Sequence, residues 1–73
     1  MGKDTDQLIG LLASGQGRRD EAPNIALAQQ IAMHADELAV AGLVLLLQHK
    51  NNDIKNDAIK VLYEVGELKP HLL

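Results

Sequence analysis

Histidines are the residues of this sequence that could most readily bind a metal. His34 and Glu37 are three residues apart, a spacing that can place two ligands on one metal ion. The expected boundary between two helices falls between them, and no second pair of ligands supports them, so no metal site is predicted. His34 and His49 are instead expected near helix C-termini, where the helix dipole favours histidine.

Nucleophilic catalysis would need an activated hydroxyl or thiol. The chain has no cysteine, and its hydroxyl groups belong to Thr5, Ser14 and Tyr63. Thr5 and Ser14 fall at the two ends of one expected helix, where such residues act as caps. No Ser-His-acid set can be assembled from the sequence. We therefore predict no catalytic residue, no enzymatic activity and no cofactor.

A glycine-rich segment, Gly15-Gln16-Gly17-Arg18-Arg19, precedes the second expected helix and could hold an anion at a helix N-terminus. It follows no strand and lacks the full phosphate-loop pattern. A turn that ends the first helix is the favoured interpretation, because glycine readily takes the left-handed conformation found after helices.

The charge balance argues against several partners. Seven basic and ten acidic residues give a net charge of −3, whereas general nucleic-acid binding relies on a basic surface and membrane-surface helices are rich in basic residues. The longest nearly continuous apolar run, 38–47, is too short to cross a bilayer. The polar N-terminus lacks the apolar middle of a secretory signal, so a cytoplasmic protein is expected.

Size and composition favour a small helical domain. Apolar residues make up 47% of the 73-residue chain, yet it contains no Phe, no Trp and one Tyr. Ala and Leu are strong helix formers, and small side chains let helices approach closely. A core of this size rarely supplies more than about 3–5 kcal/mol by itself. Further chain or another subunit is therefore expected to reinforce it.

Apolar spacing predicts an all-α fold with four main helices and room for a short fifth element at the C-terminus. The expected helices cover about 4–14, with Asp4 or Thr5 as its cap, then 20–34, 36–48 and 53–68. Pro23 lies near the start of the second, where proline is tolerated. Asn51, Asn52 and Asp53 are expected to form a turn that caps the fourth.

The apolar positions also predict which faces are buried. The second helix has a stripe of Ala22, Ile25, Ala28, Ile31 and Ala32, with a register uncertain by about two residues. The stripe of the fourth is expected to pack on the third helix and across to the second. The third is apolar around most of its circumference and is therefore expected to be central or to meet another chain. Candidate residues for self-association are Leu43, Leu45 and Leu47.

The helices repeat in pairs. An offset of 35 residues places Leu8 on Leu43, whereas in the second helix of each pair an offset of 34 places Ile25 on Ile59, and 36 matches Ala22 to Ala58. One domain, 1–73, would thus hold a repeat at about 4–35 and another at about 36–69. Residues 70–73 would begin a possible third unit. Repeat folds normally need about three copies, so a fragment of a longer protein or a homo-oligomer is predicted.

The segment from Asp53 to Gly66 resembles the second-helix signature of HEAT repeats. There an acidic turn residue precedes a β-branched residue, a basic residue, and then Ala and Leu at helical spacing, here Ile54, Lys55, Ala58 and Leu62. The resemblance covers 43–66 well and the first copy weakly. Tyr63 departs from it, since a small residue usually follows the Leu. Armadillo and other paired-helix repeats stay open as alternatives.

The resemblance implies an α-α superhelix of two stacked antiparallel helix pairs that acts as a protein-binding scaffold. It would place the second helix of each pair on the concave, partner-binding side. The polar residues there are the candidate protein-binding residues, although a solvated helix surface would look the same: Asn56, Asp57, Lys60, Glu64 and Glu67. A nucleic-acid-associated protein and an accessory subunit of an enzyme are the alternative functions.

Overall fold

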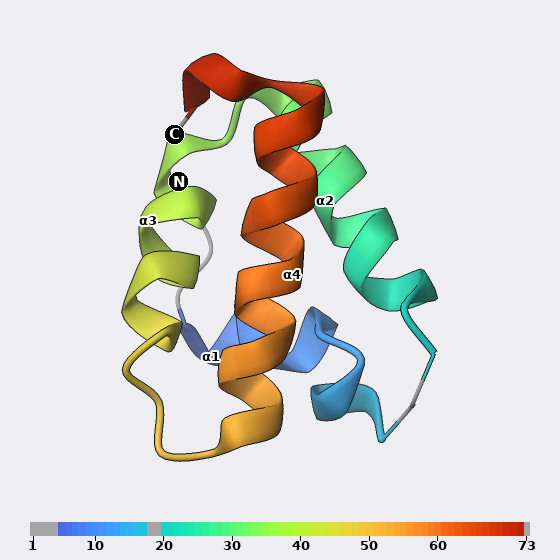
Figure 1. Cartoon of the computed structure of the whole chain (residues 1–73), viewed down its shortest axis with the longest axis vertical. Coiled ribbons are helices and arrows are strands. Elements are labelled where there is room, and N and C mark those ends of the chain that lie inside the picture. Colours follow the sequence, from blue (N-terminus) through green and yellow to red (C-terminus); the bar gives the residue numbers. More distant parts are fainter. Residues whose placement is uncertain (1–4, 18–19, 73) are drawn as a thin grey trace.

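The computed structural model describes residues 5–17 and 20–72, which form four α-helices and two short 3-10 helices without a strand (Figure 1). Asp4, Arg18, Arg19 and Leu73, which entered the predictions above, lie outside this part. The α-helices are α1 (Thr5–Leu11), α2 (Ala22–His34), α3 (Glu37–Leu46) and α4 (Asn52–Leu68), and the 3-10 helices are η1 (Ser14–Gln16) and η2 (Pro70–Leu72).

The all-α fold of four main helices is confirmed, and η2 is the short fifth element. Pro23 lies in the first turn of α2, as predicted. The first helix is shorter than expected because the chain leaves α1 after Leu11 and turns into η1. Gly17 follows η1 with a φ of 69°, a left-handed conformation that glycine adopts without steric cost.

The most central helix is α4. It lies between α2 and α3 and also contacts η1 and η2, while α1 lies beside α3 (Figure 1). The apolar stripe of α4 therefore packs on both α3 and α2, as its spacing predicted. Of the two alternatives predicted for the third helix, a central position is not what the structure shows, because one face of α3 is open to solvent; contact with another chain stays a prediction. An apolar sequence shows what a helix can bury, not what is there to cover it.

One apolar cluster joins all four helices. The buried residues of α2, α3 and α4 include pairs three, four or seven apart, the spacing of one helical face, while α1 contributes Leu8 and is followed by Leu12. Most of these side chains are aliphatic and of moderate size, so the helices can pack without any aromatic residue in the core. The buried members are Leu8, Leu12, Leu27, Ala28, Ile31, Ala39, Val40, Leu43, Leu46, Ile54, Ala58, Val61 and Val65.

The buried face of α2 is rotated from the predicted one. Ala28, Ile31 and Ala32 are buried as expected, whereas Ala22 and Ile25 are exposed. Asn24 and Leu27 are buried in their place. The physical reason is a polar residue on the buried face: Asn24 has hydrogen-bond partners in the interior, so α2 can bury it at little cost.

Both turns that precede the last two helices carry side-chain caps. The Asp36 carboxylate accepts a hydrogen bond of 3.0 Å from the Ala39 amide at the start of α3. The Asn51 side chain accepts bonds from the Asp53 and Ile54 amides, which confirms the predicted cap region of α4. Ala35 ends α2 with a φ of 47°, and this left-handed turn reverses the chain into α3.

Gly15 is required for a different reason from Gly17. A Cβ on Gly15 would meet the backbone carbonyl of Ile9 in α1. That carbonyl belongs to the helix itself and cannot move aside as a flexible side chain would. The close approach of η1 to α1 therefore depends on glycine at this position.

Gly15→Ala is expected to destabilise the domain by about 1–3 kcal/mol, the usual cost of forcing an extra methyl group into packed structure. Gly10→Ala is the matched control, because Gly10 is an exposed residue of α1 whose added Cβ meets nothing within 4 Å. It is expected to stabilise by about 0.5–1 kcal/mol. Urea unfolding followed by circular dichroism measures both changes; equal effects would contradict the contact with Ile9.

Candidate functional site

A groove between α2 and α4 is the leading candidate for a binding site. It has a volume of about 330 Å³ and is lined by residues of α2 and α4 and by Glu21, immediately before α2. The lining residues are Glu21, Asn24, Ile25, Ile59, Lys60, Tyr63 and Glu64. Because α2 and α4 pack directly against each other, the backbone frame of the groove is set by the core.

Three apolar side chains stay accessible in the groove. Ile25 from α2 and Ile59 from α4 are each nearly half exposed, and Tyr63 is 70% exposed. Tyr63 is also the only aromatic residue of the chain. An apolar surface bordered by polar groups is typical of binding sites, and tyrosine is among the residues that contribute most to protein interfaces.

Charged residues surround this apolar surface. Lys60 Nζ lies 3.1 Å from Glu21 Oε1, and both side chains are more than half exposed. Such a surface ion pair contributes about 0–1 kcal/mol, so it orients the two side chains more than it stabilises the fold. Glu64 adds a second carboxylate, which leaves the groove with two acidic groups and one basic group.

A buried hydrogen-bond network lies beneath one end of the groove. Asn24 is 3% exposed and Asp57 is 9% exposed. The Asn24 amide nitrogen donates to Asp57 Oδ1 at 3.0 Å, while Asn24 Oδ1 accepts from the Ala13 amide at 2.9 Å. Asp57 Oδ2 accepts from the Ser14 amide at 2.8 Å. The network thus joins α2 and α4 to the backbone that follows α1.

The network keeps Asp57 ionised in the interior. Burial alone would raise the pKa of Asp57, but interactions with the Ser14 hydroxyl and amide, the Asn24 amide and the positive charge of Lys60 outweigh it and lower the pKa below 3.8. The Ser14 amide is the best-defined of these donors, since the Ser14 hydroxyl oxygen is buried and completes no hydrogen bond of good geometry.

The structure separates the five residues that were proposed to bind a partner. Lys60 and Glu64 line the groove, and Asn56 and Glu67 are exposed on α4 outside its lining. Asp57 is buried, and internal hydrogen bonds occupy both of its carboxylate oxygens. Asp57 is therefore a structural residue and cannot contact a partner in this conformation.

The three leucines proposed for self-association also differ. Leu43 is fully buried among the residues of the core, Leu47 is partly buried against it, and Leu45 is exposed. Leu43 is consequently unable to reach a second chain, because α3 already directs it into the core of its own chain. Only Leu45 lies on a surface that such a contact could use.

The apolar part of the groove was not predicted from the sequence. Ile25 and Ile59 are equivalent at the offset of 34 residues. Ile25 had been assigned to the buried stripe of the second helix, and Ile59 had been given no role. Positions related by that offset share their environment: Leu27 and Val61 are both buried, whereas Ile25 and Ile59 are both accessible. Tyr63 carried a signal too, as the residue that departs from the repeat pattern.

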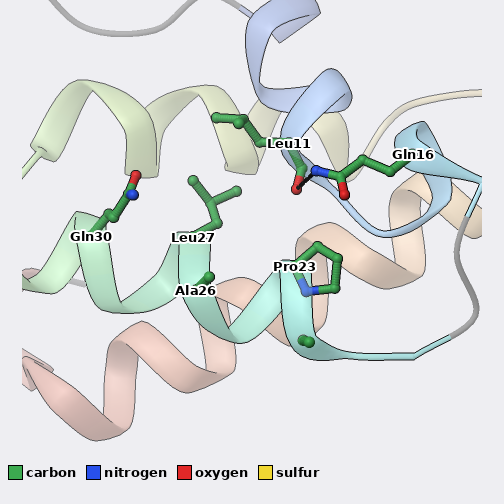
Figure 2. Close-up of a pocket in the computed structure, with 7 residues that line it drawn as sticks. Leu11, Gln16, Pro23, Ala26, Leu27 and Gln30 are labelled. Carbon is green, nitrogen blue, oxygen red and sulfur yellow. Dashed lines mark hydrogen bonds between the residues drawn. The ribbon is translucent and has the colours of Figure 1, made fainter.

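A second hollow, of about 310 Å³, lies where α1 and η1 approach α2 (Figure 2). It is lined by Leu11 of α1, by Gln16 of η1, and by Pro23, Leu27 and other residues of α2. The Gln16 side chain is already engaged, since its amide donates to the Leu11 carbonyl at 3.3 Å. Fewer polar side chains line this hollow than line the groove between α2 and α4. We assign no ligand to it.

Two kinds of site receive no support from the part of the chain that the structure describes. No group of three or more His, Cys, Asp or Glu residues there could hold a metal ion. No helix there has both the length and the apolar character needed to span a bilayer. His49 takes part in a turn instead, because its Nδ1 accepts a hydrogen bond from the Asn51 amide at 3.0 Å.

Comparisons with protein-family models, with curated proteins and with solved structures found no match. The resemblance to HEAT repeats therefore rests on the sequence pattern alone, which covers 43–66 well and the first copy weakly.

Asp57 predicts how stability depends on pH. Because its pKa is lower in the folded chain than the ordinary 3.8, ionised Asp57 stabilises the fold above that pH. The contribution is lost as pH falls from 3.8 through the lower folded-state pKa. Asp57→Asn is expected to weaken this dependence. This substitution should also lower the free energy of unfolding by about 1–3 kcal/mol at neutral pH. The new side-chain NH₂ group cannot accept a hydrogen bond, so one of the two donors, the Ser14 amide or the Asn24 side chain, loses its acceptor.

Urea unfolding of the natural chain and of Asp57→Asn, measured from neutral pH down to about pH 2.5, tests this expectation. Glu67→Gln is the control, because Glu67 lies exposed on the same helix. If Glu67→Gln reduced the loss of unfolding free energy at acid pH as much as Asp57→Asn did, this pH dependence could not be assigned to the buried network.

Proposed function

We propose that this chain is a non-catalytic helical module that binds another protein through the groove between α2 and α4. The observation that carries the proposal is the group of three accessible apolar side chains, Ile25, Ile59 and Tyr63, bordered by charged residues. Surfaces of this composition gain affinity from burying the apolar centre and specificity from the polar border.

The setting of the groove suits recognition without a large conformational change. Its walls are two helices whose opposite faces lie in the core, and the Asn24–Asp57 hydrogen bond ties them together at one end. A surface that is already ordered loses little conformational entropy on binding. A segment of helix or extended chain with aliphatic side chains would fit this kind of groove.

The helix arrangement is also compatible with the HEAT-like organisation that we include in the proposal. In two stacked helix pairs, the first helices should be neighbours, and so should the second helices. Here α1 lies beside α3 and α2 lies beside α4. The groove lies between the second helices, on the side where the family resemblance leads us to expect a partner.

A nucleic-acid partner is the weaker alternative. Among the residues that line the groove, Glu21 and Glu64 provide two negative charges and Lys60 one positive charge. A phosphate backbone would be repelled by this balance, since nucleic-acid affinity comes largely from neutralising phosphates with basic side chains. The same lining gives no reason to favour an accessory enzyme subunit.

Replacing Tyr63 tests the proposal. Peptides selected from a displayed library against the full chain provide the ligands, and their affinities are then measured by calorimetry. Tyr63→Ala is expected to weaken binding at least about fivefold, because truncating a central tyrosine in an interface commonly costs more than about 1 kcal/mol. Lys60→Glu is expected to alter affinity while leaving folding intact, since the ion pair it breaks is exposed.

Met33→Ala is the matched control. Met33 lies on α2 and is exposed to a similar degree as Tyr63, but it is not part of the groove. Selected peptides whose affinity falls with Met33→Ala and not with Tyr63→Ala would show that the groove is not the binding site.

A further inference from the structure

The groove between α2 and α4 carries an excess of negative charge. Glu21 and Glu64 each contribute a carboxylate to its lining, and Lys60 contributes an ammonium group. Asp57, beneath one end of the groove, adds a third carboxylate that its hydrogen bonds keep ionised. Three carboxylates and one ammonium group give these four side chains a net charge of −2. The groove therefore attracts cations.

Lys60 leaves one carboxylate of the lining without a counterion. Its Nζ lies 3.1 Å from Glu21 Oε1. Glu64 follows Lys60 by four residues, about 6 Å further along α4. Among the residues that the structure describes, Glu64 takes part in no ion pair. Glu64 is also partly buried, and a carboxylate that is less exposed to water forms stronger hydrogen bonds with a charged donor.

The unpaired carboxylate shares the groove with an aromatic ring. Tyr63 precedes Glu64 on α4, and its side chain is 70% exposed. A guanidinium group can stack on a tyrosine ring while its N–H groups donate to a carboxylate. A lysine ammonium group is compact and strongly hydrated, so it combines these two contacts less well. The pair of Tyr63 and Glu64 therefore favours arginine among the basic residues.

We propose that the groove recognises a peptide segment of another protein in which an arginine adjoins aliphatic side chains. This inference rests on the proposed function and adds the chemistry of the partner. The aliphatic side chains cover Ile25 and Ile59, and the arginine contacts Tyr63 and Glu64. The volume of about 330 Å³ is near the lower end of the range for binding pockets, about 300–1,000 Å³, which suits a few side chains of one segment.

The charge of the whole chain acts in the same direction. A net charge of −3 attracts a basic segment during encounter and opposes an acidic one. The aliphatic side chains remain necessary, because a cation alone would leave Ile25 and Ile59 exposed to water. The partner is therefore expected to combine both kinds of side chain within one short segment.

Peptides selected from a displayed library against the full chain provide the first test. Binders should be enriched in arginine, relative to the unselected library, and depleted in aspartate and glutamate. One binder is then compared by calorimetry with versions that carry lysine or glutamine in place of its arginine. Affinity should fall from arginine to lysine to glutamine. Affinities that do not depend on the arginine would overturn the inference.

Glu64→Gln is the matching change in the chain, because it removes the charge and nearly preserves the shape. It is expected to weaken binding of the arginine peptide about tenfold and to reduce the effect of added salt on affinity. Glu67→Gln is the control, since Glu67 is exposed on the same helix outside the lining. Equal losses for the two variants would exclude a specific contact with Glu64.

Lys60→Gln should act in the opposite direction. Without the ammonium group, Glu21 and Glu64 both lack a counterion, so the arginine peptide is expected to bind about two- to threefold more tightly. Circular dichroism checks that each variant stays folded. Weaker binding to Lys60→Gln would mean that Lys60 itself contacts the ligand, and a basic partner would then be excluded.

Tyr63→Ala separates this inference from the proposed function. If Tyr63→Ala weakens binding while Glu64→Gln and loss of the peptide arginine do not, the groove binds a partner of different chemistry. The proposed function then stands and the inference is refuted. If the library yields no binder whose affinity depends on Tyr63, the proposed function and the inference both fail.

Discussion

The hydrogen bond between Asn24 and Asp57 is the constraint on which the arrangement of the helices depends. Apolar packing lets α2 and α4 slide or rotate against each other at modest cost, since many aliphatic contacts are interchangeable. A buried amide paired with a buried carboxylate is not interchangeable, because any shift leaves a polar group without a partner. The pair therefore selects one register between the two helices, and with it the shape of the groove.

The network also organises the chain between α1 and α2. The Ala13 and Ser14 amides follow the last turn of α1 and have no partner within that helix. Asn24 and Asp57 accept hydrogen bonds from them, and this satisfies backbone groups that would otherwise be buried and unpaired. Two side chains thereby position the end of α1, the start of α2 and the middle of α4.

The sequence predicted the fold class better than it predicted the surfaces. Four helices follow from apolar spacing, glycine and proline positions and capping residues, and all of these signals are local. The position of α3 depends on what covers it, which no local signal contains. Asp57 could have been recognised, because it lies three residues after Ile54 and four before Val61, on the apolar face of its helix. Asn24 likewise lies on the apolar face of its helix, three residues before Leu27 and four before Ala28.

Tyr63 gives the molecule an unusual optical property. With no tryptophan in the chain, its only intrinsic fluorophore lies on the surface, at the groove, and not in the core. Unfolding should change the emission little, because this ring is already surrounded by water. Occupation of the groove would remove that water. The emission of the unlabelled chain would therefore respond to ligands in the groove more than to the integrity of the fold.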